Sequence, residues 1–172
     1  MMGSKTYFFI GLLMITLISC KPKYEAPEIN AGSTNPERYL MVGGTFASGY
    51  TDDALFKYGQ EHSLSAYIYQ SINQVQSSSF TQPFTDENSV GMSSTGLSRL
   101  VLGYKTDCNN ETSLSPVREA NTGDASVFNN INTGTPFNNM GIPNLKLAEI
   151  FDVDYTNQNP FYSRMVSSPN TT

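Results

Sequence analysis

The sequence has few of the side chains that hold metal ions or nucleic acids. One histidine and two cysteines in 172 residues argue against a zinc site, which takes several such ligands. The ten lysines and arginines form no cluster beyond Lys21 and Lys23, and the net charge is −5, so no nucleic-acid partner is expected. No cofactor is expected either, because the glycines at residues 43–44 lack the lysine of a phosphate-binding loop and the spacing of a dinucleotide fingerprint.

Aromatic residues, in contrast, are plentiful. Ten tyrosines and ten phenylalanines in a chain with 15% charged residues indicate a packed core and not a disordered chain. The length favours a single domain.

The first residues have the pattern of a bacterial lipoprotein signal. Lys5 supplies positive charge, residues 7–18 form an apolar run of 12, and Leu-Ile-Ser before Cys20 fits the lipobox. We therefore expect a signal peptide over residues 1–19 and acyl chains on Cys20, which anchor the protein to a membrane without spanning it. The alternative is an ordinary signal peptide followed by an unmodified cysteine.

After the lipid anchor, the sequence divides into a tether and a folded domain. Residues 20–37 are rich in Pro, Gly and small polar groups, which is typical of a tether, and residues 38–172 form the domain. Lys21 directly after the acylated cysteine favours the outer membrane of a Gram-negative cell envelope.

The first half of the domain predicts one strand and one helix. An apolar run over residues 39–42 indicates a buried strand over residues 38–42. Residues 51–62 are expected to form a surface excursion. Ser63 is a favourable N-cap for a helix over residues 63–75. The spacing of its apolar residues predicts a buried stripe of Leu64, Tyr67, Ile68, Ser71, Ile72 and Val75.

The second half is less regular. Residues 99–104 predict a strand, whereas turn formers dominate residues 105–135 and predict no element; a loop of that length could form part of a substrate rim. An extended segment is expected to end near Met140. Pro143 suits the first turn of a helix whose buried side would comprise Leu145, Ala148 and Ile150.

The most informative stretch is residues 38–50, Arg-Tyr-Leu-Met-Val-Gly-Gly-Thr-Phe-Ala-Ser-Gly-Tyr. It joins the first predicted strand to a glycine-flanked hydroxyl, that of Thr45. Several α/β hydrolases present a nucleophile on such a turn, at the carboxyl edge of a parallel sheet. The glycines permit backbone angles that other residues resist and allow a substrate to approach closely.

Residues 43–50 resemble the first motif block of the SGNH/GDSL hydrolases, in particular a lipoprotein branch whose block reads Gly-Asn-Ser-Leu-Thr-Ala-Gly-Tyr or Gly-Asp-Ser-Leu-Thr-Ala-Gly-Tyr. In this alignment Thr45 stands at the position of the nucleophilic serine, and Gly44 at that of Asp or Asn. Residues 139–144, Asn-Met-Gly-Ile-Pro-Asn, resemble the second block, Asn-x-Gly-Val-Pro-Gly. The last glycine of that block donates its backbone N–H to the oxyanion, and its counterpart here is Asn144.

Shorter similarities extend the resemblance over residues 38–166, including Phe-Thr-Gln-Pro-Phe at residues 80–84. The resemblance implies a three-layer, flavodoxin-like α/β fold and hydrolysis of a lipid, acyl or carbohydrate ester. The family's third block, Gly-x-Asn-Asp, and its Asp-x-x-His block do not occur in the chain, which would then form the front part of the family domain.

The base of the reaction is missing from this alignment. His62, the one histidine, does not match the family's catalytic position and is expected at an exposed helix entry. An alcohol without a base is a poor nucleophile, so we expect no appreciable esterase activity from this polypeptide alone. The alternative is a non-catalytic surface lipoprotein that binds a ligand with the same scaffold.

Two acidic pairs and one thiol remain. Asp52 with Asp53, and Asp152 with Asp154, could bind a cation or act as a glycosidase carboxylate pair, although solvated loop acids are the simpler interpretation. Cys108 is expected to be a free, partly buried thiol.

Overall fold

The computed structural model describes residues 25–28, 32–33, 38–74, 79–131, 136–152 and 155–165. The chain divides into two compact units, residues 1–30 and residues 31–172. Residues 25–28 of the first unit are described, and they are exposed and without regular structure. The predicted signal peptide and Cys20 lie outside the described residues, as does most of the tether. None of the helices described is long and apolar enough to cross a membrane.

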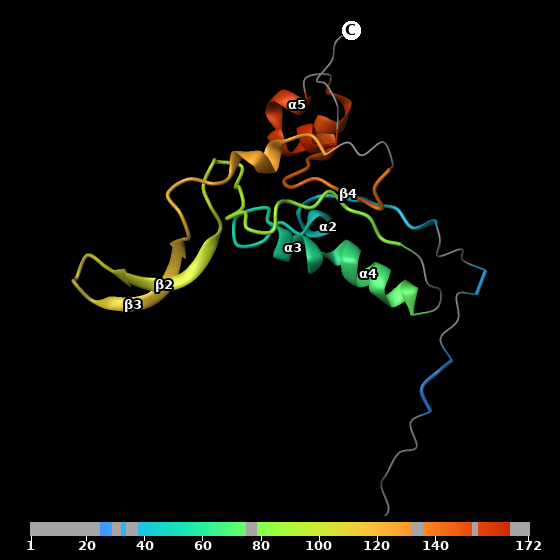
Figure 1. Cartoon of the computed structure of the whole chain (residues 1–172), viewed down its shortest axis with the longest axis horizontal. Coiled ribbons are helices and arrows are strands. Elements are labelled where there is room, and N and C mark those ends of the chain that lie inside the picture. The colour runs from blue at the N-terminus through green and yellow to red at the C-terminus, as the bar shows by residue number, and fades with distance from the viewer. Residues whose placement is uncertain are drawn as a thin grey trace, which may run out of the picture. The chain divides into compact units, whose positions relative to one another are not determined.

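The second unit is a mixed α/β arrangement of short elements (Figure 1). The strands are β1 (Met41–Gly43), β2 (Leu100–Thr106), β3 (Thr112–Arg118) and β4 (Asn139–Gly141). The α-helices are α2 (Thr45–Ser48), α3 (Lys57–Glu61), α4 (Leu64–Asn73) and α5 (Tyr155–Gln158), and the 3-10 helices are η2 (Ala125–Phe128), η3 (Leu147–Phe151) and η4 (Pro160–Arg164).

Strands β1 and β4 form a parallel pair, with Met41 opposite Asn139 and Gly43 opposite Gly141. The pair confirms a strand before the glycine turn and an extended segment ending near Met140. The prediction of a buried strand is wrong, however, because Val42 is 65% exposed. In the described part of the chain β1 pairs with β4 alone, so its other edge has no strand partner there.

Helix α4 begins where the sequence predicted, since the Ser63 side chain accepts a hydrogen bond from the backbone N–H of Ala66. The predicted stripe is wrong: Leu64 and Tyr67 are exposed, and the helix buries Ser65, Ala66 and Tyr69. The hydroxyl of Ser65 donates to the carbonyl of Ala47 at 2.8 Å. Small residues therefore face α2, because only they allow this close approach. Val75 lies outside the described residues.

The surface excursion predicted for residues 51–62 is also wrong in its middle, where Ala54, Leu55 and Phe56 are among the most buried residues. The backbone of Leu55 exchanges two hydrogen bonds with that of Met92. The main apolar cluster comprises Leu55, Met92, Val127, Ile142 and Phe161. Each such side chain contributes roughly 1.5–3 kcal/mol through its burial.

The strand predicted over residues 99–104 is confirmed as β2, but β3 occupies a region where no element was expected. The two strands form an antiparallel hairpin whose turn is held by the Asp107 carboxylate, which accepts hydrogen bonds from the backbone N–H groups of Asn109 and Glu111. Pro116 is tolerated in β3 because a two-stranded sheet has only edge strands. Cys108 lies in the turn and is exposed, which corrects the expected partial burial.

No α-helix begins at Pro143. The backbone of Asn144 adopts a left-handed φ of 57°, which ends any helical path there, and the short 3-10 helix η3 follows. The predicted buried side is wrong for Ala148 and Ile150, which are exposed, whereas Leu145 packs against the apolar cluster.

Candidate functional site

The candidate site lies where the chain leaves β1 and β4. Because the two strands are parallel and in register, both end at the same edge, and the turns that follow them meet. Gly44 and Thr45 follow β1, and Asn144 comes three residues after β4. The backbone N–H of Asn144 donates a hydrogen bond to Oγ1 of Thr45 at 3.1 Å, across 99 residues of sequence. The structure thus brings together the two residues that the sequence singled out.

The turn that carries Asn144 is fixed on both sides. Its start is held by the backbone N–H of Ile142, which donates to the carbonyl of Gly43 at 2.8 Å. The carbonyl of Pro143 accepts a hydrogen bond from the Asn159 amide at 2.9 Å, in the interior. Asn tolerates the left-handed backbone better than most residues, so the turn can keep its N–H directed at Thr45.

Thr45 is the first residue of α2, a one-turn helix whose two ends are joined by a hydrogen bond. Gly49 ends it with a left-handed φ of 78°, and the hydroxyl of Ser48 donates to the carbonyl of Thr45 at 2.9 Å. Helix α2 lies directly against β4: a Cβ atom at Gly141 would be 2.4 Å from the backbone nitrogen of Ser48. Glycine at position 141 is therefore required for this contact, since the backbone cannot move aside.

Behind α2 lies a buried amide network that the sequence did not predict. The amide of Asn139 donates to the carbonyl of Ala47 at 2.8 Å and to Oε1 of Gln82 at 3.0 Å. The amide of Gln82 donates to the backbone carbonyl of Gln60, whose own side-chain amide donates to the carbonyl of Pro83. Satisfied networks of this kind specify one arrangement of the groups that they join. The available signal was the presence of Gln82 and Asn139 in the two motif-like segments.

A second buried group that sequence reasoning missed is Arg164, which is 2% exposed. Its guanidinium donates to the backbone carbonyls of Val127 and Pro83, and burial lowers its pKa to about 10. Arg164 therefore joins η4 to two distant segments of the chain, one of which leads into the amide network.

The one histidine does not contact Thr45 through any hydrogen bond of the described residues. Nδ1 of His62 lies 2.8 Å from the carbonyl of Tyr58, so this nitrogen carries the proton and donates it. The His62 ring also packs against the Tyr58 ring, with centroids 4.2 Å apart. His62 follows α3 as its C-cap and directly precedes Ser63, the N-cap of α4, so the expected exposed position at a helix entry is confirmed.

In each predicted acidic pair, one carboxylate is bound to another side chain of the protein. The Asp53 carboxylate is paired with Arg118 at 2.5 Å and accepts a hydrogen bond from Tyr50 at 3.1 Å. Burial, and then the charge of Asp53, raise the pKa of Tyr50 above its usual value. Asp152 accepts a hydrogen bond from Gln158, whereas Asp154 lies outside the described residues. Across the described ranges, no three His, Cys, Asp or Glu side chains are grouped so as to hold a metal ion.

Comparison with protein-family models, with curated proteins and with solved structures gives no match for this chain. The chemistry of the site is therefore argued from its own geometry.

Proposed function

We propose that the Thr45–Asn144 pair is the nucleophile and oxyanion-donor half of an ester-hydrolase site of the SGNH/GDSL type, on a three-layer, flavodoxin-like α/β scaffold. The observation that carries the proposal is the hydrogen bond from the Asn144 N–H to Thr45 Oγ1 at 3.1 Å. The parallel β1–β4 pair, with the glycine turn at its carboxyl edge, supports the same interpretation.

In this proposal each residue has one role. Oγ1 of Thr45 attacks the ester carbonyl carbon, and the Asn144 N–H stabilises the negative oxygen of the tetrahedral intermediate. One such donor is worth roughly 10²–10³ in kcat. The hydroxyl proton must pass to a base, and the alcohol must receive a proton as it leaves. His62 does not supply this base in the proposal, because no hydrogen bond among the described residues joins its ring to Thr45, and its Nδ1 donates to the Tyr58 carbonyl.

The proposal is tested by turnover of p-nitrophenyl acetate and butyrate, with and without imidazole as an added base. Without imidazole, the wild type and Thr45→Ala should hydrolyse the esters at the same slow rate. With imidazole, Thr45→Ser should exceed Thr45→Ala by about tenfold or more, because it lacks the β-branch that crowds the attacked carbonyl. Equal rates for these two variants in imidazole would refute the half-site. If the wild type hydrolyses the esters in buffer without imidazole and Thr45→Ala does not, the protein supplies a base of its own, and this part of the proposal is refuted.

A second candidate is a ligand-binding protein that uses the same scaffold without chemistry. The placement of the chain's one histidine favours it, because His62 bonds to the Tyr58 carbonyl and no hydrogen bond among the described residues joins it to Thr45. The ester assay separates the two candidates, since a purely binding protein gains nothing from Thr45→Ser and imidazole.

We also propose that the chain is a lipoprotein anchored to the outer membrane of a Gram-negative cell through acylated Cys20. The lipobox before this residue supports the proposal. Expression with tritiated palmitate should label the wild type and leave Cys20→Ala unlabelled, and globomycin should cause the unprocessed precursor to accumulate. An unlabelled wild type would refute the anchor.

A further inference from the structure

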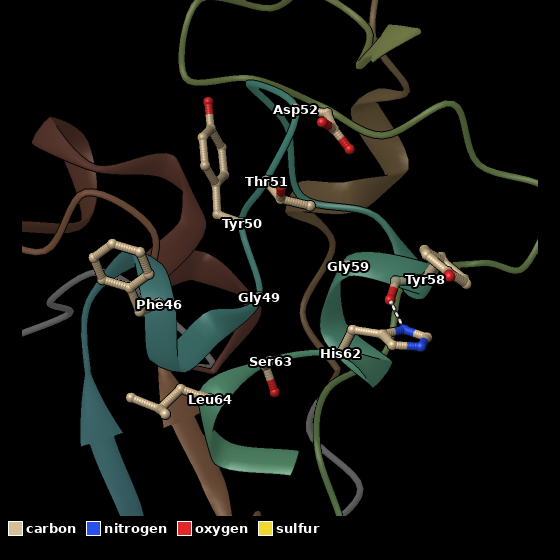
Figure 2. A pocket seen from close by; sticks show the side chains of 10 residues that line it. All are labelled: Phe46, Gly49, Tyr50, Thr51, Asp52, Tyr58, Gly59, His62, Ser63 and Leu64. Carbon is tan, nitrogen blue, oxygen red and sulfur yellow. Dashed lines mark hydrogen bonds between the residues drawn. The ribbon is translucent and has the colours of Figure 1, made fainter. Parts of the chain in front are cut away.

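A pocket of about 420 Å³ opens beside α2 and does not include Thr45 among its lining residues. Three aromatic residues are among those that line it: Phe46 of α2, Tyr50 on the turn after α2 and Tyr58 of α3, whose rings point in different directions in Figure 2. The rings of Phe46 and Tyr58 are 82% and 64% exposed, respectively. Such exposure is costly for an aromatic side chain, so the two rings have a large apolar area available to a ligand.

The pocket has a firm base. Gly49 and Gly59 lie between Phe46 and Tyr58 in Figure 2, and a Cβ atom at Gly59 would be 2.5 Å from the carbonyl oxygen of Gly49. The hydrogen bond from His62 to the Tyr58 carbonyl and the tilted packing of the two rings hold the Tyr58 side chain in place. The Tyr58 ring is therefore positioned before any ligand arrives, which lowers the entropic cost of binding.

Among the residues that line the pocket, the charged side chain is an acid, Asp52. Asp52 stands at its upper rim in Figure 2, with a left-handed φ of 50° and a backbone carbonyl held by the N–H of Leu100 at 2.8 Å. The neighbouring Asp53 is paired with Arg118. Within the described part of the chain, the Asp52 carboxylate has neither a hydrogen-bond nor an ion-pair partner, and no lysine or arginine lines the pocket.

We propose that this pocket binds an organic ammonium cation, with the positive charge towards Asp52 and the alkyl groups against the exposed ring of Tyr58. The faces of aromatic rings attract cations, and a carboxylate beside such a ring adds a counter-charge. A neutral apolar ligand would leave the Asp52 charge without a counter-ion, and an anion would be repelled. The inference does not rest on the ester chemistry of Thr45.

The test is saturation-transfer NMR and calorimetric titration of the full chain with choline chloride, set against 3,3-dimethyl-1-butanol. This alcohol has the shape of choline, with carbon in place of the charged nitrogen. Asp52→Asn is the key variant, because Asn accepts the same left-handed backbone and loses only the charge. Glu111→Gln, at the exposed tip of the β2–β3 hairpin, is the matched control that removes the same charge elsewhere.

Choline should bind at least about tenfold more tightly than the alcohol, and both Asp52→Asn and Tyr58→Ala should weaken it by about tenfold, a loss typical of one charge or one ring. Glu111→Gln should bind as the wild type does. The absence of saturable choline binding up to about 20 mM would overturn the proposal, as would equal affinity for the alcohol. Unchanged binding by a folded Asp52→Asn variant would overturn it too.

Discussion

The backbones of Gly49 and Gly59 approach so closely that a Cβ atom on Gly49 would lie 2.4 Å from the carbonyl oxygen of Gly59. Through this contact the turn that ends α2 rests on α3. Because a backbone atom stands in the way, neither residue can take a side chain without movement of one segment.

Gly49→Ala should therefore lower the free energy of unfolding by about 2–4 kcal/mol, as the sum of left-handed strain and overpacking. Gly96→Ala is the matched control: its φ of 84° resembles the 78° of Gly49, but a Cβ atom there meets nothing within 4 Å. It should cost only the strain, about 1–2 kcal/mol. Urea unfolding of both variants measures the difference, and equal losses would contradict the close approach.

Truncation of the buried Arg164 side chain should cause a large loss of stability. Arg164→Ala leaves the buried carbonyls of Val127 and Pro83 without donors and opens a cavity, so unfolding should become easier by about 3–4 kcal/mol. Arg164→Lys should recover only part of this, since one ammonium group lacks the planar fork that reaches both carbonyls. Lys105→Ala, exposed on the hairpin, should change stability by less than about 0.5 kcal/mol. Full recovery by lysine would contradict the two-carbonyl role.

Asn139 connects stability to the site. Asn139→Asp keeps the shape but replaces the NH₂ group that donates to Ala47 and Gln82 with a buried acceptor. We expect a loss of about 2–3 kcal/mol above neutral pH, measured by urea unfolding, because a buried charge then faces two other acceptors. Acidification that protonates this carboxyl should restore part of the loss. If Asn139→Asp were as stable as the wild type, the Asn139 amide would not make the two hydrogen bonds to Ala47 and Gln82.

The acid side of the stability curve depends on Asp124. Hydrogen bonds from Ser89 and Ser126 hold its pKa below the ordinary 3.8 in the folded chain. A carboxyl with a lowered folded pKa contributes stability that is present above the unfolded value and lost as the pH falls through the folded value. The stability gap between the wild type and Asp124→Asn should therefore shrink as the pH falls below about 4. A gap that is constant with pH would contradict this role.

Local signals in the sequence predicted several elements correctly. Ser63 indicated the start of α4 because an N-cap is a contact between near neighbours, and residues 99–104 indicated β2 because apolar and β-branched residues favour strands. The juxtaposition of Thr45 with Asn144 followed from a motif resemblance together with the rule that parallel strands end at a common edge.

The errors arose where tertiary contacts override local pattern. Leu64 and Tyr67 of the predicted stripe are exposed and Ile68 and Ile72 only half-buried, because the close approach of α2 selects small residues on another face of α4. Spacing alone does not reveal this effect. Strand β3 was missed because its sequence is polar and contains Pro116, which only an edge strand permits. The network of Gln60, Gln82 and Asn139 depends on contacts across up to 92 residues, and no local signal specifies it.

In the proposed half-site the Asn144 N–H assists the hydroxyl of Thr45, and no hydrogen bond among the described residues joins that hydroxyl to a base. The most direct measurement is mass spectrometry of the phosphonyl adduct left by an alkyl fluorophosphonate, with and without imidazole. We predict an adduct at residue 45 of Thr45→Ser that forms faster as imidazole is added, a far slower adduct in the wild type, and none in Thr45→Ala. Failure of Thr45→Ser to form the adduct at any imidazole concentration, while its fold is intact, would contradict the account.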